Sequence, residues 1–340
     1  MHASNAPTNS TVAVIGAGSW GTALAILLAK NHARVHLWAH RQAHADSINA
    51  ARCNTRYLPD IPLPDNLQAT ADLQVALSDV DLVLVVVPSH AFRATLKAIS
   101  PFMAGYKHLA WATKGLEPET NNLLHEICRE ELGEAIVPVV VTGPTFAAEV
   151  ARGLPSAVTV ACADEHYAEH VARMLHNDVF RAYISTDIIG AQIGGAVKNV
   201  IAIAAGIADG LGYGANTRAA LITRALAEIM RFGVTLGGQR ETFMGLAGLG
   251  DLILTATDNQ SRNRRLGLLL AQGKTKQQAS EEIGQVTEGL HTAKEIYTLA
   301  QQHNVDMPIT EQVYRVLFEG LTPNDSVQAL LSRDLKPELG

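Results

Sequence analysis

Residues 11–21 read TVAVIGAGSWG, a short apolar run followed by three glycines in the pattern G-x-G-x-x-G. Residues 11–15 predict a buried strand, and residues 22–30 (TALAILLAK) predict the helix after it. Between them, Gly16 permits a tight turn, Gly18 lets the backbone approach a pyrophosphate, and Gly21 lets the helix pack against the strand. Because the helix N-terminus also offers N–H groups to phosphates, the stretch predicts a dinucleotide-binding unit. A glycine-rich turn without a ligand is the alternative.

The first half of the chain continues to alternate apolar strand-like runs with helical segments. Strands are predicted over residues 34–38, 82–87, 108–113 and 136–141, which is typical of a parallel sheet covered on both faces. From about Ile188 these runs stop, and helices are predicted over residues 188–211, 217–236, 261–272, 291–303 and 310–319. We therefore expect an α/β fold with an N-terminal Rossmann-type doubly wound sheet and an all-α C-terminal domain. The expected boundaries are an N-terminal extension over residues 1–10, a dinucleotide-binding domain over 11–187 and a helical substrate-binding and catalytic domain over 188–340.

Composition excludes several classes of protein. The chain has 340 residues, 47% of them hydrophobic, which is ample for a core and excludes a disordered chain. Its formal net charge of -6 argues against a broad nucleic-acid surface, so a polyanion must bind at a local site. The three cysteines form no C-x-x-C pair, which indicates a reducing compartment and no zinc or other metal site. The first charged residue is Lys30, after the apolar start, so a signal peptide is not predicted, and we expect a cytoplasmic protein without a membrane span.

The end of the second predicted strand bears on the cofactor. NAD-specific folds commonly place an acid there to hold the ribose 2′-hydroxyl. Here the chain reads Trp38-Ala39-His40-Arg41, with no acid before Asp46. A cation at this point suits a 2′-phosphate, so we predict NADPH as the cofactor, with NADH accepted. The alternative is that Arg41 is only a solvated surface charge.

Lys198 is the only charged residue between Asp187 and Asp209, in a helix that is apolar on all sides. Such a helix is buried, and a lysine in its middle is costly unless it has a partner. Burial lowers the pKa of a lysine, which makes it usable as a general acid or base near neutral pH. Gly194 and Gly195, one turn earlier on the same face, are expected to leave room for a substrate. The alternative is a lysine whose ammonium reaches the surface between the domains.

Two other charges stand near predicted binding positions. Lys114 follows the strand predicted over residues 108–113, and ligands of open α/β sheets bind beyond the carboxyl ends of strands. Asp251 is the lone charge in the apolar stretch 245–254 and is a natural partner for a buried lysine. The alternatives are an ordinary surface lysine and a turn or N-cap aspartate.

Cations begin one predicted helix, at Ser261-Arg262-Asn263-Arg264-Arg265. The helix dipole opposes cations at this end, so the cluster makes sense if an anion is bound there by backbone N–H groups and an arginine fork. For Arg264 and Arg265 a solvated helix face is the alternative.

Eight stretches together resemble one family, the bacterial type of NAD(P)-dependent glycerol-3-phosphate dehydrogenase. They are VIGAGSWGTALA at 14–25, VPSH at 87–90, ATKGL at 112–116, GPTFA at 143–147, GGAVKN at 194–199, GLGDL at 248–252, NQSRN at 259–263 and VTEG at 286–289. They follow the family's order over nearly the whole chain, and only about the first ten residues are unmatched.

The resemblance implies reversible hydride transfer between NAD(P)H and dihydroxyacetone phosphate, which gives sn-glycerol 3-phosphate for phospholipid synthesis, in a homodimer. It implies that Lys198 exchanges a proton with the C2 oxygen, that Lys114 and Asn199 orient or polarise that oxygen, and that Asp251 holds the lysine. It further implies substrate contacts, mostly with the phosphate, from Gly143, Thr145, Thr255, Ser261, Arg262 and Asn263. The cofactor contacts that it implies are Ser19, Trp20, His40, Lys114, Ala147, Arg262, Val286 and Glu288.

Two other hypotheses remain open. A related reductase of the β-hydroxyacid or ketopantoate type also joins a nucleotide domain to helices with a Lys-Asn pair, and the phosphate site at Arg262 discriminates against it. A non-catalytic dinucleotide sensor explains the glycine turn but leaves Lys198, Asp251 and Arg262 unexplained. A transcription factor is disfavoured by the acidic charge balance and the lack of a basic recognition helix.

Overall fold

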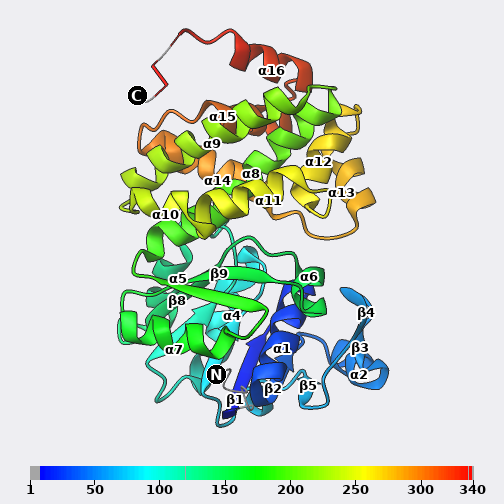
Figure 1. The fold of residues 1–340 in the computed structure, drawn as a ribbon, viewed down its shortest axis with the longest axis vertical. Coiled ribbons are helices and arrows are strands. Elements are labelled where there is room, and N and C mark those ends of the chain that lie inside the picture. The colour runs from blue at the N-terminus through cyan, green and yellow to red at the C-terminus, as the bar shows by residue number, and fades with distance from the viewer. Residues whose placement is uncertain (1–7, 119, 336, 339–340) are drawn as a thin grey trace. The chain divides into compact units, whose positions relative to one another are not determined.

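The computed structural model of the chain describes residues 8–118, 120–335 and 337–338. Two compact units divide the chain: residues 1–117 with 122–192, and residues 118–121 with 193–340 (Figure 1). The sequence predicts a boundary between Asp187 and Ile188, whereas the observed boundary lies about a turn further on, inside the helix that begins at Ile188. Of the predicted N-terminal extension, residues 1–7 lie outside the described residues, while residues 8–10 belong to the first strand.

The first unit contains an eight-stranded sheet in the order β10-β9-β8-β7-β6-β1-β2-β5. Its strands are β1 (Thr8–Ile15), β2 (His32–Trp38), β5 (Leu67–Thr70), β6 (Leu82–Val85), β7 (His108–Trp111), β8 (Val137–Thr142), β9 (Ser156–Ala161) and β10 (Phe180–Ser185). Every neighbouring pair is parallel except β8 and β9, which are antiparallel. Successive residues of β1 point to opposite faces, and Val12, Ala13, Val14 and Ile15 are all fully buried, so both faces of the sheet are covered as predicted.

Helices and one small hairpin complete this unit. They are α1 (Ser19–Asn31), α2 (Gln42–Ala51), β3 (Cys53–Asn54), β4 (Leu58–Pro62), α3 (Leu73–Ala76), α4 (Ser89–Ile99), η1 (Ser100–Phe102), α5 (Leu124–Leu132), α6 (Ala147–Arg152) and α7 (Glu165–Leu175). The chain order of the strands reverses at β1, which has β2 on one side and β6 on the other. Ligands of open α/β sheets bind at such a switch point, and the glycine turn follows β1 there.

The second unit is helical, as predicted (Figure 1). Its elements are α8 (Ile188–Gly210), α9 (Ala215–Thr235), α10 (Arg240–Met244), the π-helical turn η2 (Leu246–Gly250), α11 (Asp251–Thr257), α12 (Arg262–Ala271), α13 (Lys276–Ile283), α14 (Glu288–Gln302), α15 (Pro308–Phe318) and α16 (Pro323–Leu331). By length and composition alone α8 could cross a membrane, but 83% of its apolar window is buried within the structure. This is the environment of a core helix.

Glycines bring α8 into backbone contact with its neighbours. A Cβ on Gly206 would lie 2.1 Å from the carbonyl oxygen of Arg264, so α12 crosses α8 without any intervening side chain. Likewise a Cβ on Gly194 would lie 2.4 Å from the carbonyl oxygen of Ala247 in η2. The expectation that Gly194 leaves room for a substrate is therefore wrong. Its missing side chain makes room for η2, the turn that leads into Asp251.

Candidate active site

The three glycines after β1 differ in what surrounds them. Gly16 has a φ of +127°, and a Cβ there would lie 2.3 Å from the carbonyl oxygen of Val86. A Cβ on Gly21 would lie 1.9 Å from the carbonyl oxygen of Gly16, so both glycines are required by the fold. Around Gly18, in contrast, a Cβ would meet nothing within 4 Å. The space that Gly18 leaves at the N-terminus of α1 fits a diphosphate, and the residues present therefore fit a dinucleotide.

Trp20, in the first turn of α1, adds a polar group to the same place. Its indole Nε1 is buried and has no hydrogen-bond partner among the described residues. A buried N–H donor without an acceptor is uncommon in folded proteins. Because this atom is closed off from the surface, a cofactor contact of Trp20 stays a prediction.

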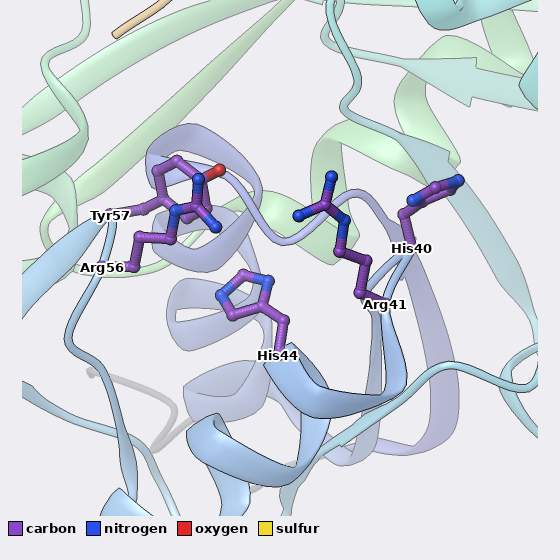
Figure 2. Close-up of a pocket in the computed structure, with 5 residues that line it drawn as sticks. All are labelled: His40, Arg41, His44, Arg56 and Tyr57. Carbon is purple, nitrogen blue, oxygen red and sulfur yellow. The ribbon is translucent and has the colours of Figure 1, made fainter. Parts of the chain in front are cut away.

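A hollow of about 240 Å³ lies beyond the end of β2 and is lined by His40, Arg41, His44, Arg56 and Tyr57. Figure 2 shows Arg56 and Tyr57 on one side of it and Arg41 on the other, with His44 of α2 below. The Arg56 guanidinium lies 5.1 Å from the centroid of the Tyr57 ring. The five lining residues include two arginines and no acid, which is the composition expected around a 2′-phosphate.

Four residues that sequence reasoning missed build this region of the site: His44, Asn54, Arg56 and Tyr57. The buried Asn54 side chain donates hydrogen bonds to Ala17 O (2.9 Å) and Thr22 Oγ1 (2.8 Å), and its Oδ1 lies 3.1 Å from His44 Nε2. Ser19 Oγ donates to the carbonyl oxygen of Tyr57 (2.7 Å). These bonds connect the β3–β4 hairpin to the glycine turn. The hairpin strands are too short to show a periodic hydrophobic pattern. The lack of an acidic residue before Asp46 was therefore the only sequence signal for this region.

Lys114 follows β7 at the carboxyl end of the sheet, where the sequence predicts it. Its Nζ donates to the carbonyl oxygen of Gly143 (3.3 Å), and Thr145 Oγ1 donates to the same oxygen (3.3 Å). Gly143 has a φ of +148° and follows β8, the neighbouring strand. Ala147 begins α6 directly afterwards. The structure thus brings Lys114, Gly143 and Thr145 together.

Lys198 is buried in α8, with 7% of its surface exposed. Its Nζ donates to Asp251 Oδ1 (2.7 Å) and to Thr255 Oγ1 (2.8 Å). Asp251, at the start of α11, is completely buried. The pairing of Lys198 with Asp251 is therefore as the sequence predicts, and a side chain that is only 9% exposed disfavours the alternative of a lysine that extends to the surface. Thr255 donates its own proton to the carbonyl oxygen of Asp251 (2.6 Å), which leaves its oxygen lone pairs for the lysine.

Asn199, next to the lysine, belongs to a chain of amide hydrogen bonds across three helices. Its Oδ1 accepts from Asn263 Nδ2 of α12 (2.9 Å), and its Nδ2 donates to Glu288 Oε2 of α14 (3.4 Å). Asn263 Oδ1 accepts from the backbone N–H of Gly289 (2.9 Å). Both polar atoms of the Asn263 amide therefore have partners within the protein. This geometry positions Asn199, while a contact from Asn263 to the substrate phosphate stays a prediction.

The basic cluster of α12 divides into residues of different exposure. Ser261 is the N-cap, and its Oγ accepts from the N–H of Arg264 (3.2 Å). Arg262 is half-buried, and its guanidinium contacts Gln285 Oε1 (3.5 Å), next to the exposed Val286. Arg265 is exposed, as the solvated-face alternative predicts. For Arg264 that alternative is wrong, because its side chain is only 8% exposed and is paired with Asp209.

Both units match models of one protein family. Residues 11–168 match the NAD-dependent glycerol-3-phosphate dehydrogenase N-terminus, and residues 187–328 match the C-terminus of the same family. The glycerol-3-phosphate dehydrogenase (NAD(P)+) of Methylococcus capsulatus is 56% identical over 328 residues, which cover 96% of this chain and 98% of that protein. That of Pseudoalteromonas translucida is 55% identical, with coverage of 97% and 98%.

Solved structures agree with this match. The crystal structure of glycerol-3-phosphate dehydrogenase from Coxiella burnetii superposes with a TM-score of 0.92 at 46% identity, and covers 96% of this chain and 100% of that one. A ketopantoate reductase from Ralstonia eutropha reaches a TM-score of 0.58 at 17% identity, over 93% and 99% of the two chains. The second likeness shows a shared fold alone. The chain therefore belongs to the NAD(P)-dependent glycerol-3-phosphate dehydrogenase family.

Proposed function

We propose that this protein catalyses the reversible NAD(P)H-dependent reduction of dihydroxyacetone phosphate to sn-glycerol 3-phosphate. The observation that carries the proposal is a buried ammonium, that of Lys198, which Asp251 and Thr255 hold from two sides. A charge buried at this cost points to a chemical role. The reaction takes place in the cytoplasm and supplies glycerophospholipid synthesis.

Lys198 moves the proton in this reaction. In reduction its ammonium donates a proton to the C2 oxygen of the ketone, and in oxidation the neutral amine accepts the proton of the C2 hydroxyl. The bound nicotinamide supplies or accepts the hydride. Asp251 and Thr255 hold the ammonium in place, and Lys114 and Asn199 orient and polarise the same oxygen.

The substrate phosphate binds at the start of α12. Arg262 provides a guanidinium fork, and Ser261, Asn263 and Thr255 lie on the same two helices, α11 and α12. Gly143 and Thr145 provide further substrate contacts. The helix dipole supports this assignment, because it makes cations unfavourable at a helix N-terminus. A bound dianion would offset this unfavourable interaction between the dipole and the arginines of the first turn.

The cofactor binds along the glycine turn in the first unit, which forms its domain, while the second unit, from residue 193 onward, forms the catalytic domain. We assign its contacts to Gly16, Gly18, Ser19, Trp20, Gly21, His40, Arg41, Lys114, Ala147, Arg262, Val286 and Glu288. The hollow with Arg41 and Arg56 supports NADPH as the preferred form, with NADH accepted. A homodimer belongs to the proposal and is tested by the mass of the protein in solution.

Two substitutions test the proposal. Lys198→Met should lower kcat by about 10²- to 10⁴-fold, the range for a lost general acid, while the Kd for NADPH stays the same. Near-normal turnover of this variant would show that Lys198 takes no part in the proton transfer.

Arg262→Ala should raise the KM for dihydroxyacetone phosphate by at least about tenfold, because a charged hydrogen-bond donor to the phosphate is lost. An unchanged KM would favour a substrate without a phosphate, as in a ketopantoate-type reductase.

A further inference from the structure

Arg264 is buried in the first turn of α12, two residues after Arg262. Its Nη1 is paired with Asp209 Oδ2, and both side chains are 8% exposed. Its Nε donates to Asn259 Oδ1 (3.1 Å), and Nη1 also approaches the carbonyl oxygen of Ala256 (3.5 Å). One guanidinium group thus connects the first turn of α12 to the end of α8 and to the stretch of residues 256–259.

This placement is costly for stability alone. The dipole of α12 opposes a cation in its first turn, and a buried ion pair is often no more stable than apolar residues of the same volume. Asp209 also accepts from Arg218 Nε of α9 (3.0 Å), so the cluster contains two cations and one anion. The donors of a planar guanidinium are fixed relative to one another. Arg264 can therefore hold its hydrogen-bond partners in a defined geometry, which a packed apolar side chain cannot do.

The segments that Arg264 connects are those that carry the proposed site. Asp209 lies near the end of α8, the helix of Lys198. Ala256 lies near the end of α11, the helix of Asp251 and Thr255. Asn259 lies in the short connection between α11 and the N-cap of α12, so the bond to Asn259 restrains the loop that leads into the proposed phosphate site.

We propose that Arg264 is a positioning residue for the substrate phosphate. Through Asn259 and Asp209 it holds the 258–261 connection and the first turn of α12 in the geometry that lets Arg262 and the helix N–H groups meet the dianion. It does not touch the phosphate itself. This inference rests on the phosphate site of the proposed function.

The test compares Asn259→Ala, Arg264→Lys and the control Arg265→Lys. Asn259 is exposed, so its truncation removes the restraint without leaving a buried charge unpaired. Arg264→Lys keeps the charge opposite Asp209 but cannot bond Asp209 and Asn259 with one fixed fork. Arg265→Lys makes the same chemical change one residue later, on the exposed face. For each variant we would measure the KM for dihydroxyacetone phosphate, the inhibition constant of inorganic phosphate, kcat, the Kd for NADPH and Tm.

We expect Asn259→Ala and Arg264→Lys to raise the KM and the phosphate inhibition constant together, by about tenfold, as for the loss of one charge-assisted hydrogen bond. Their kcat at saturating substrate and their Kd for NADPH should match the wild type, and Arg265→Lys should change nothing. The inference is overturned if Asn259→Ala leaves both phosphate-dependent constants unchanged. It is equally overturned if kcat, NADPH affinity and Tm all fall in the variants whose phosphate-dependent constants rise, since that combination indicates a general loss of structure.

These outcomes are distinct from those of the proposed function. If the wild type reduces dihydroxyacetone phosphate and Arg262→Ala raises its KM, the phosphate site stands whatever Arg264 does. Unchanged constants in Asn259→Ala and Arg264→Lys would then remove the positioning role alone.

Discussion

The hydroxyl of Thr255 is oriented by its own helix. Because the Lys198 ammonium can only donate, the Thr255 oxygen accepts from it, and the hydroxyl proton is left for Asp251, whose carbonyl oxygen is the nearer acceptor at 2.6 Å and whose Oδ1 lies at 3.3 Å. Thr257, on the same helix, makes the equivalent bond to Ile253 but is exposed. The two threonines therefore separate the effect of helix bonding from the effect of holding the lysine.

Thr255→Val should lower kcat by about tenfold, because a hydrogen bond to a charged group is worth about 1.5 to 3 kcal/mol. Thr257→Val should leave kcat as it is. Steady-state kinetics of the two variants at saturating substrate make the comparison. Equal effects of the two substitutions would show that Thr255 acts only through the helix.

Gly18 is the glycine of the turn whose small size no described neighbour requires. Gly18→Ala should therefore change the free energy of unfolding by less than about 1 kcal/mol, yet raise the Kd for NADPH by about tenfold or more. Gly21→Ala should instead unfold the protein or lower its Tm strongly, since its Cβ would meet Gly16 O at 1.9 Å. Calorimetry of both variants, with and without NADPH, gives both quantities. Unweakened NADPH binding by Gly18→Ala would place the diphosphate elsewhere.

At the scale of elements, α15 depends on a carboxylate from another helix. Its N-cap, Met307, has no side-chain capping bond, and Glu228 of α9 accepts from the N–H groups of Ile309 (2.7 Å) and Thr310 (3.3 Å) instead. Burial raises the pKa of Glu228 from 4.5 to about 7, although these bonds act in the opposite direction. The junction of α9 and α15 therefore titrates near neutral pH.

This raised pKa makes stability depend on pH. The folded state binds the Glu228 proton more tightly than the unfolded state does, because the pKa is about 7 in the folded state and 4.5 in the unfolded state. This tighter binding stabilises the folded state fully below about pH 4.5, and the stabilisation is lost as the pH rises from there through about 7. Relative to Glu228→Gln, which stays neutral, the wild type should lose roughly 2 to 3 kcal/mol of unfolding free energy between about pH 5 and pH 8. Urea denaturation at both values measures the difference. Parallel losses in the two proteins would contradict the raised pKa.

Long elements and lone charges were predictable, and contacts between distant short segments were not. The helix around Lys198 was evident because it is long and uniformly apolar, and the same scarcity of charge singled out Asp251. β9 and β10 were missed: β10 is an edge strand with one buried residue, Phe180, so it lacks the continuous apolar run of the inner strands, and no local pattern shows the antiparallel pairing of β9. Arg264 was misjudged because its partner, Asp209, lies 55 residues earlier, where no local pattern shows it.

For the whole molecule, an acidic chain must recognise substrates that are themselves anions. The net charge of the chain is -6, yet Arg41 and Arg56 both line one hollow, so attraction to a cofactor phosphate must come from such local groups.

Arg41→Glu and Arg56→Gln should each raise the KM for NADPH by about tenfold and change the KM for NADH much less, because only NADPH carries the 2′-phosphate. The exposed Arg34 of β2 provides the control, Arg34→Gln. Equal effects on both cofactors would refute a 2′-phosphate contact.

The most direct test of the whole proposal is the oxidation of NADPH by the purified wild-type protein, followed by absorbance after addition of dihydroxyacetone phosphate. We expect the absorbance to fall, with one sn-glycerol 3-phosphate formed for each NADPH consumed and no fall when dihydroxyacetone phosphate is left out. No loss of NADPH at any pH, from a protein that still binds the cofactor, would contradict the proposed reaction and favour a dinucleotide sensor.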